Sequence, residues 1–418
     1  MKKLLVKGGN ELHGEINISA AKNSVLPIIV STILCPELIS LKNIPMLEDV
    51  KVLCNLLDDL NTCVNYSSEK NLLYISTDKI NPIESDNNLV KKMRASFLLM
   101  GPMLSRFGYC KLSLPGGCNI GSRPIDLHLK GFKILGADIQ IGHGYVEASA
   151  PKGLIGNSIY LDFPSVGATE NIIMASVLAK GTTIIENAAE EPEISDLINF
   201  LNSMGAKITG GGTGKIIIEG VNSLHGISYT PIFDRIEAGT FIIAAAITNS
   251  IITLNGVNPE HLQAVIEKLK ETGVNFTFLD NKIIVDGRQK NKGVDIKTMP
   301  YPGFPTDMQS PIMSLLCTSL GNSIITETVF ENRFMHVNEL VRMGACIKLS
   351  GRSAFIQGVP RLTGCEVRAT DLRAGAAMIL AGLHAKGKTI INNIHHIDRG
   401  YLNIENKFNS LGANIERI

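Results

Sequence analysis

One thiol of this chain lies in a glycine-rich segment, five residues before an arginine. The segment reads Leu114-Pro115-Gly116-Gly117-Cys118-Asn119-Ile120-Gly121-Ser122-Arg123-Pro124. Because glycine adopts positive φ without strain, the segment is predicted to form a loop rather than a strand. A thiol near a guanidinium has a stabilised thiolate, so Cys118 could act as a nucleophile, a metal ligand or a proton donor.

Ionic side chains also stand at the start of several segments that are otherwise apolar. They are Lys22 with Asn23, Arg94, Asp234 with Arg235, Asp307, and Asp371 with Arg373, while Arg123, Arg333 and Arg399 are predicted to lie in loops. Helix N-termini carry free N–H groups and a partial positive charge, and arginine grips phosphate or carboxylate in a bidentate manner. The three aspartates could instead be N-caps that neutralise helix dipoles. Taken together, the charges favour one anion-binding cleft.

Length and composition exclude several classes of protein. At 418 residues the chain is too long for one hydrophobic core, which predicts two domains. A net charge of +1 gives no global field that would attract nucleic acid or anionic lipid. The longest apolar stretches, 24–35 and 374–385, are shorter than the roughly 18 residues needed to span a bilayer. Eight cysteines without a C-x-x-C pair predict reduced thiols in the cytoplasm and no zinc site.

A short motif, an apolar residue followed by Gly-Ala, recurs at a nearly constant interval. The copies are Leu135-Gly136-Ala137, Met204-Gly205-Ala206, Met343-Gly344-Ala345 and Leu411-Gly412-Ala413, with looser copies at Thr272-Gly273-Val274 and 60–64. The glycines from 136 to 412 are 69, 68, 71 and 68 residues apart. Each is predicted to be a left-handed C-cap that ends a helix before a strand. The period indicates repeated units of about 70 residues.

Each unit is predicted to run in the order α-β-α-β-β. One copy places helices at 169–179 and 193–204 around a strand at 182–186, and another places helices at 306–319 and 336–343. The opening helices are apolar on every side, so they should be buried inside a domain. Six units in two domains predict an α/β (α+β) fold with three units per domain. A solenoid is the alternative, but its helices need a solvated face.

Other residues are predicted to be structural. Five cysteines in apolar surroundings should belong to the core, namely Cys35, Cys54, Cys110, Cys317 and Cys346. The glycine-rich segment 210–214 leads from one strand into another, so it should be a hairpin turn rather than a phosphate loop. His128 and His396 have no nucleophile nearby in sequence, which favours hydrogen-bonding roles.

Nine stretches, spread in order over essentially the whole chain, form a specific set. They are Ile18-Ser19-Ala20-Ala21-Lys22-Asn23, Met93-Arg94-Ala95-Ser96, the segment 118–128, Ser165-Val166-Gly167-Ala168-Thr169, Asp234-Arg235-Ile236-Glu237, Phe304-Pro305-Thr306-Asp307-Met308-Gln309, Phe330-Glu331-Asn332-Arg333-Phe334, Ala369-Thr370-Asp371-Leu372-Arg373 and His396-Ile397-Asp398-Arg399-Gly400-Tyr401. This set resembles the UDP-N-acetylglucosamine enolpyruvyl transferase family. The resemblance implies a pair of inside-out α/β barrels, with one domain at 22–232 and the other at 1–21 plus 233–418.

The resemblance also implies an activity. The enolpyruvyl group of phosphoenolpyruvate would pass to the 3′-hydroxyl of UDP-N-acetylglucosamine with release of phosphate, the first committed step of peptidoglycan synthesis. The reaction would proceed by addition and elimination through a tetrahedral intermediate. The implied partners are these two small molecules, with no metal or other cofactor, no nucleic acid and no membrane. The enzyme would be cytoplasmic, and a monomer or a weak homo-oligomer.

The resemblance assigns roles residue by residue. The implied catalytic residues are Cys118, Asp307, Lys22, Asn23, Asp371 and Arg399. Phosphoenolpyruvate would contact Lys22, Asn23, Arg123, Arg333, Arg373 and Arg399. The sugar nucleotide would contact Arg94, Arg123, Pro124, Ile125, Asp126, Leu127, His128, Ser165, Val166, Gly167, Asp307 and Val329. Cys118 would be the general acid and the target of the epoxide fosfomycin, and either Asp307 or Asp371 would accept the hydroxyl proton.

One position departs from the family pattern, and two other functions remain as alternatives. Many family members carry a lysine two residues before the serine of the Ser-Val-Gly stretch, where this chain has Phe163 and Pro164. Enolpyruvylshikimate phosphate synthase shares the implied fold and donor, but it uses no cysteine on this loop. An idle paralogue would have no reason to keep all four of Cys118, Asp307, Lys22 and Arg399.

The role of Cys118 can be tested by two substitutions. Cys118→Asp should retain turnover because a carboxylic acid can also deliver a proton, whereas Cys118→Ser should lose about a hundredfold or more. Phosphate release from phosphoenolpyruvate, followed at saturating acceptor, measures both. Equal rates in the two variants would contradict the general-acid role.

Overall fold

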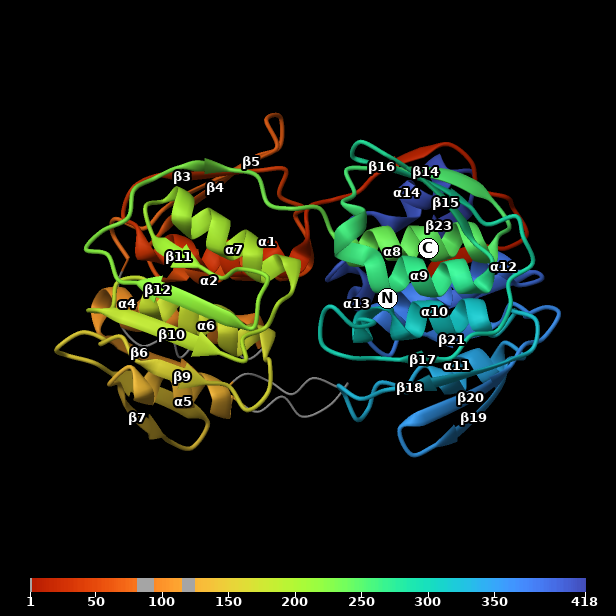
Figure 1. Cartoon of the computed structure of the whole chain (residues 1–418). Helices are drawn as coiled ribbons and strands as arrows, with labels where there is room; N and C mark the ends of the chain where they lie inside the picture. The colour runs from red at the N-terminus through yellow and green to blue at the C-terminus, as the bar shows by residue number, and fades with distance from the viewer. Residues whose placement is uncertain (1, 81–93, 115–124) are drawn as a thin grey trace. The chain divides into compact units, whose positions relative to one another are not determined.

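The computed structural model describes residues 2–80, 94–114 and 125–418, and it divides into two compact units. The terminal unit comprises residues 2–19 and 233–418, so both chain ends belong to it. The central unit comprises the described residues between 20 and 232. Each unit combines helices with small sheets (Figure 1), which confirms the predicted mixed α/β class.

Three helices pack against one another in the middle of the terminal unit (Figure 1). They are α8 (Arg235–Ile247), α10 (Gln309–Leu316) and α12 (Leu372–His384). Every residue of α8 is buried, as expected for a helix that is almost entirely apolar after Glu237. The shorter helices are η3 (Pro259–Leu262), α9 (Gln263–Thr272), η4 (Thr306–Met308), α11 (Val337–Arg342), α13 (His395–Asp398) and α14 (Ile404–Ser410).

Three four-stranded sheets surround these helices, in the orders β21-β22-β1-β23, β15-β16-β14-β2 and β17-β18-β20-β19. The first joins the two ends of the chain, because β1 pairs with both β22 and β23. The strands are β1 (Leu4–Lys7), β2 (Glu15–Asn17), β14 (Ile251–Asn255), β15 (Asn275–Leu279), β16 (Lys282–Asp286), β17 (Ile296–Lys297), β18 (Asn322–Thr326), β19 (Cys346–Ser350), β20 (Ser353–Gln357), β21 (Glu366–Arg368), β22 (Lys388–Asn392) and β23 (Asn414–Arg417).

The described part of the central unit is built in the same way. Its inner helices are α1 (Lys22–Ser31), η2 (Arg94–Leu99), α4 (Met100–Phe107) and α6 (Val166–Ser176), with α6 packed on both η2 and α4. The remaining helices are η1 (Thr32–Leu34), α2 (Glu48–Asp59), α5 (Asp126–Ile134) and α7 (Pro192–Ser203).

The central unit holds sheets in the orders β11-β12-β10-β9, β13-β3-β5-β4 and β6-β8-β7 over its described residues. The strands are β3 (Ile39–Lys42), β4 (Cys63–Ser67), β5 (Leu72–Ser76), β6 (Tyr109–Ser113), β7 (Asp138–Ile141), β8 (Tyr145–Ser149), β9 (Ser158–Tyr160), β10 (Thr182–Glu186), β11 (Lys207–Thr209), β12 (Lys215–Glu219) and β13 (Ser228–Tyr229). Each four-stranded sheet of the molecule carries one parallel pair at an edge, as in β9 with β10.

The glycines of the sequence repeat have the predicted conformation. The φ angles of Gly136, Gly205, Gly273, Gly344 and Gly412 are 94°, 102°, 110°, 94° and 96°. All lie in the left-handed region that an L-residue with a Cβ rarely adopts. The repeat therefore marks where each outer helix turns into its hairpin.

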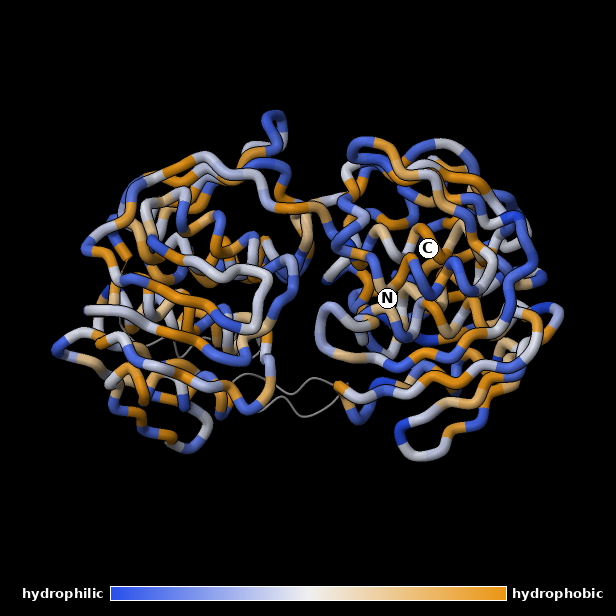
Figure 2. The backbone as a smooth tube through the Cα atoms, in the orientation of Figure 1, coloured by the Kyte–Doolittle hydropathy of each residue, from blue (hydrophilic) through white to orange (hydrophobic). Residues whose placement is uncertain are grey.

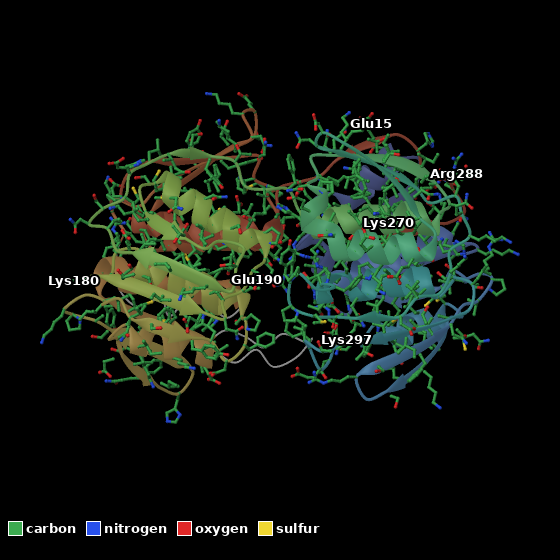
Figure 3. All side chains as sticks on the ribbon, in the orientation of Figure 1. Glu15, Lys180, Glu190, Lys270, Arg288 and Lys297 are labelled. Carbon is green, nitrogen blue, oxygen red and sulfur yellow. The ribbon has the colours of Figure 1, made fainter. Side chains whose placement is uncertain are left out.

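The interior of each unit is apolar and its surface charged. Figure 2 shows hydrophobic residues concentrated inside each unit and hydrophilic residues at loop tips. Charged side chains such as Lys180 and Arg288 lie at the surface (Figure 3). Among the residues that the structure describes, no helix is long and apolar enough to cross a membrane.

Two local expectations were wrong and one is confirmed. Cys346 is exposed rather than buried, because it opens β19 with its thiol near Gln357 on the outer side of the sheet. The helix expected at 306–319 begins as the 3-10 turn η4 and ends at Leu316. The segment 210–214 is a hairpin turn between the antiparallel strands β11 and β12.

Candidate active site

A carboxylate held by two buried arginines forms a charged cluster in the terminal unit. Oδ1 of Asp307 accepts a hydrogen bond from Arg333 Nη2 at 2.8 Å. Oδ2 accepts bonds from Arg373 Nε and Nη2 at 3.1 and 3.0 Å. Both arginine side chains are only 3% exposed, whereas that of Asp307 is 26% exposed. The cluster therefore brings together three residues that the sequence assigned to one site.

The surroundings of Arg373 keep its guanidinium charged. Burial by itself would lower the pKa of Arg373, but the charges of Asp307, Tyr401 and Asp234 raise the pKa above its usual value. Tyr401 is fully buried, lies beneath the guanidinium at 5.5 Å, and has its hydroxyl 2.8 Å from Thr240 Oγ1. The arginine is therefore a fixed cation at the start of α12.

Two of the three candidate aspartates are helix caps. Asp371 precedes α12 and accepts bonds from the backbone N–H groups of Arg373 and Ala374. Asp234 caps α8 in the same way. Asp307 instead lies inside η4 and directs its carboxylate at arginines. The N-cap interpretation thus holds for Asp371 and Asp234 but not for Asp307.

Two histidines show which other charges lie near this cluster. Burial, together with the charge of Arg333, lowers the pKa of His336 to about 4, although the charge of Asp371 opposes the shift. Burial also lowers the pKa of His396, helped by His395 and Arg399, and Asp371 again opposes it. Asp371 is therefore close enough to act on both imidazoles, whereas Arg333 acts on His336 and Arg399 on His396. Val329, another predicted site residue, follows β18, and its backbone N–H donates a hydrogen bond to Oε1 of Glu327.

The central unit places a second cation at the start of α1. Lys22 is the first residue of this helix, and its Nζ lies 2.7 Å from Asp49 Oδ2. The two side chains are only 11% and 7% exposed. The adjacent Asn23 is exposed. The sequence did not single out Asp49, although an acidic first turn of α2 was visible at Glu48 and Asp49.

A third group of candidates meets at the first turns of α5 and α6. Ser165 caps α6 by accepting a bond from Ala168 N–H, and Val166 and Gly167 follow it. The ring of His128 lies against Gly167 and is buried. The neighbouring candidates Ile125, Asp126 and Leu127 form the start of α5 and are at least partly exposed.

Three predicted site residues lie outside the described part of the chain, namely Cys118, Arg123 and Pro124. Arg94 is described as the first residue of η2, and its side chain also falls outside the description. Within the residues that the structure describes, no group of three or more His, Cys, Asp or Glu side chains could hold a metal ion.

The position that departs from the family pattern has a basic neighbour. Phe163 is 46% exposed and carries no charge. Lys130 of α5 places its Nζ 2.7 Å from Oδ2 of Asp162, the residue before Phe163. A lysine is therefore present beside this loop, although it comes from another element.

Comparisons with known proteins show which family the chain belongs to. The chain matches the EPSP synthase (3-phosphoshikimate 1-carboxyvinyltransferase) family over residues 6–408. The chain belongs to this family. Among its relatives is UDP-N-acetylglucosamine 1-carboxyvinyltransferase 1 of Clostridium acetobutylicum, 63% identical over the full length of both chains. A protein of the same name from Staphylococcus aureus is 52% identical, again over both full lengths.

Two solved structures share the fold of this chain. The enolpyruvyl transferase NikO from Streptomyces tendae superimposes with a TM-score of 0.90 at 24% identity, covering 100% of this chain and 99% of that one. An EPSP synthase from Acinetobacter baumannii gives a TM-score of 0.77 at 19% identity over 100% of both chains. At these identities the likeness concerns the fold alone.

The ion pair between Lys22 and Asp49 should be important for stability. Asp49→Asn leaves a buried ammonium without its carboxylate, so we expect the central unit to lose about 3 kcal/mol in its free energy of unfolding. Urea denaturation measures the loss. Glu416→Gln, which breaks the solvent-exposed pair with Lys7, is the matched control and should leave the midpoint unchanged. An equally small effect in both variants would contradict a structural role for the buried pair.

The depressed pKa of His336 predicts a pH-dependent stability. The folded protein keeps this imidazole neutral down to about pH 4, whereas the unfolded chain protonates it near 6.5. The neutral imidazole therefore contributes to the free energy of unfolding above pH 6.5. This contribution is lost as the pH falls toward 4, and the loss between pH 7 and pH 5 is about 2 kcal/mol. His336→Gln should remove this part of the pH dependence in urea titrations at both pH values. Parallel losses in wild type and variant would show that His336 does not titrate in this way.

Proposed function

We propose that this enzyme transfers the enolpyruvyl group of phosphoenolpyruvate to the 3′-hydroxyl of UDP-N-acetylglucosamine and releases phosphate. This would be the first committed step of peptidoglycan synthesis. The observation that carries the proposal is the 63% identity, over the whole of both chains, to a relative named for this activity. The charged cluster at Asp307 is consistent with a substrate that bears phosphate and carboxylate groups.

For the fold, we propose a pair of inside-out α/β barrels with six repeated units, three in each domain. The domains would be 22–232 and 1–21 plus 233–418. Support comes from the six small sheets, five of which share one pattern of parallel edge and antiparallel hairpin. The mutually packed helices α8, α10 and α12 support the placement of helices inside and strands outside.

Phosphoenolpyruvate would bind to the cationic residues at the helix starts, with Lys22, Asn23, Arg123, Arg333, Arg373 and Arg399 as its contacts. Arg333 and Arg373 already hold a carboxylate, that of Asp307, in the geometry that a substrate anion would use. A guanidinium offers five N–H donors, so each arginine can hold Asp307 and still meet a second anion. Because both arginines are buried and fixed, little reorganisation would be needed on binding.

The chemistry requires three proton transfers, two in the addition and one in the elimination. In the addition, the 3′-oxygen bonds to C2 of phosphoenolpyruvate, the hydroxyl proton passes to a base, and C3 receives a proton. In the elimination, a base takes a proton from C3, the C–H electron pair restores the C2=C3 double bond, and the C2–O bond breaks with its electrons leaving on phosphate. We assign proton delivery to Cys118 and acceptance of the hydroxyl proton to Asp307. Asp371, as a capping carboxylate nearby, would stabilise positive charge developing at C2.

The sugar nucleotide would bind at the first turns of α5 and α6. Its contacts would be Arg94, Arg123, Pro124, Ile125, Asp126, Leu127, His128, Ser165, Val166, Gly167, Asp307 and Val329. Free N–H groups at the start of the 11-residue helix α6 suit a diphosphate. Lys130, beside Asp162, would supply the positive charge that Phe163 does not.

The proposed enzyme needs no metal or other cofactor, because fixed arginines neutralise the anionic substrate. We further propose a cytoplasmic monomer or weak homo-oligomer that binds neither nucleic acid nor membrane. Its partners would be the two small-molecule substrates.

The choice of acceptor separates this function from its closest rival. Phosphate release from phosphoenolpyruvate should depend on UDP-N-acetylglucosamine and remain at background with shikimate 3-phosphate. Asp307→Asn should reduce kcat about a hundredfold or more, because an amide cannot accept the hydroxyl proton. Release only with shikimate 3-phosphate would overturn the proposal in favour of the EPSP synthase reaction.

A further inference from the structure

A single buried amide joins three elements of the central unit. Asn171 of α6 is completely buried. Its Oδ1 lies 2.7 Å from Gly101 N at the start of α4. Its Nδ2 lies 3.0 Å from the carbonyl oxygen of Phe97 in η2 and 3.0 Å from Nδ1 of His128 in α5. Neither the proposed chemistry nor the sequence motifs use this side chain.

The hydrogen-bond partners of Asn171 determine which side-chain atom is the amide oxygen and which is the nitrogen. The backbone N–H of Gly101 can only donate, so the atom facing it must be the amide oxygen. The carbonyl of Phe97 can only accept, so the atom facing it must be the NH2 group. A flipped amide would set donor against donor and acceptor against acceptor. The orientation of Asn171 thus follows from two independent backbone contacts.

This orientation also determines the proton on His128. Because the NH2 group of Asn171 donates to Nδ1, that nitrogen must present its lone pair. A neutral imidazole with an accepting Nδ1 carries its proton on Nε2. A doubly protonated ring would set an N–H against the NH2 group. The edge of Phe97 packs on the ring at a centroid distance of 5.2 Å, which holds its plane.

The Nε2 side of the ring faces the start of α6. A Cβ placed on Gly167 would stand 3.4 Å from Cε1 and 3.6 Å from Nε2 of His128. Gly167 follows the cap residue Ser165 in the first turn of that helix. The Nε2 edge of the imidazole therefore lies beside the first turn of α6, where the backbone N–H groups of the helix start.

We propose that Asn171 is a positioning residue that holds His128 as a neutral donor, with its Nε2–H directed at an acceptor oxygen of the sugar nucleotide. The inference rests on the proposed function, which places UDP-N-acetylglucosamine at His128 and Ser165–Gly167. Phosphoryl and carbonyl oxygens of this ligand accept hydrogen bonds, so a proton on Nε2 gives the ring the donor that such an oxygen requires. The same amide holds the carbonyl of Phe97, three residues after Arg94.

The tautomer can be measured on the full-length wild-type protein, without any assay of activity. Histidine nitrogen NMR at neutral pH distinguishes the Nε2–H form from the Nδ1–H form and from imidazolium. The chain has nine histidines, and a His128→Gln variant identifies the signal of His128. We expect the Nε2–H form. An Nδ1–H ring or an imidazolium would overturn the proposal even if the enzyme is active.

Substitution of Asn171 tests the consequence for binding. Asn171→Asp keeps the oxygen that accepts from Gly101 and removes the donor to His128. Asn171→Leu removes both the acceptor oxygen and the NH2 donor without adding a charge. In both variants we expect the KM for UDP-N-acetylglucosamine to rise about tenfold while kcat changes less than about twofold, as loss of one binding hydrogen bond predicts. An unchanged KM in both would overturn the proposal.

Asn202→Asp is the matched control. Asn202 of α7 uses its amide in the same manner, with Oδ1 accepting from Ile208 N–H and Nδ2 donating to Ile208 O, both at 2.9 Å. This variant loses a comparable donor in the same unit, so its KM should stay at the wild-type value even where its stability falls. An equal rise in KM in the control would reduce Asn171 to a merely structural role.

A double substitution tests whether Asn171 acts through His128. In a His128→Gln background, Asn171→Leu should raise KM no further than about twofold. A full additional tenfold rise would overturn the positioning role. Failure of the proposed function is a separate result, because wild-type protein would then release no phosphate with UDP-N-acetylglucosamine, whatever the tautomer of His128.

Discussion

The pair of buried guanidiniums on Asp307 is the constraint around which the terminal unit is organised. Arg333 and Arg373 are each 3% exposed, and removing such charges from water is costly unless a carboxylate compensates them. Asp307 supplies that charge through three hydrogen bonds. The arginines are consequently fixed before any ligand arrives, which is the condition for electrostatic stabilisation of an anionic substrate.

The buried helices explain why the charges gather where they do. The sides of α8 and α12 pack into the unit, so a polar group along their length would lie in the apolar core. Only their N-terminal ends can accept charge, where backbone N–H groups need acceptors. Asp234 and Asp371 meet that need as caps. A repeat of buried helices thus produces a repeat of polar ends, and the proposed chemistry uses those ends.

The central unit also buries polar side chains, and it provides their partners in two ways. Lys22 retains its charge inside the unit through the carboxylate of Asp49 at 2.7 Å. His128 is also buried, and the amide of Asn171 lies 3.0 Å from its Nδ1, where our proposal makes that nitrogen an acceptor. An ion pair suits a residue proposed to hold phosphate, whereas a neutral donor suits recognition of a nucleotide. Both partners come from helices other than the one that carries the functional residue.

The sequence alone determined the repeat, the left-handed glycines, the buried helices and the candidate residues, because periodicity and backbone strain are local properties. It failed for Cys346, whose neighbours are apolar but whose position on β19 faces outward. It also missed Asp49 and Asn171, because their partners Lys22 and His128 are distant in sequence, 43 residues away in the second case. Only the tertiary structure decided that Asp307 binds arginines while Asp371 and Asp234 cap helices. All three aspartates stand near a helix start, and the fold alone places Asp307 within hydrogen-bond distance of two guanidiniums.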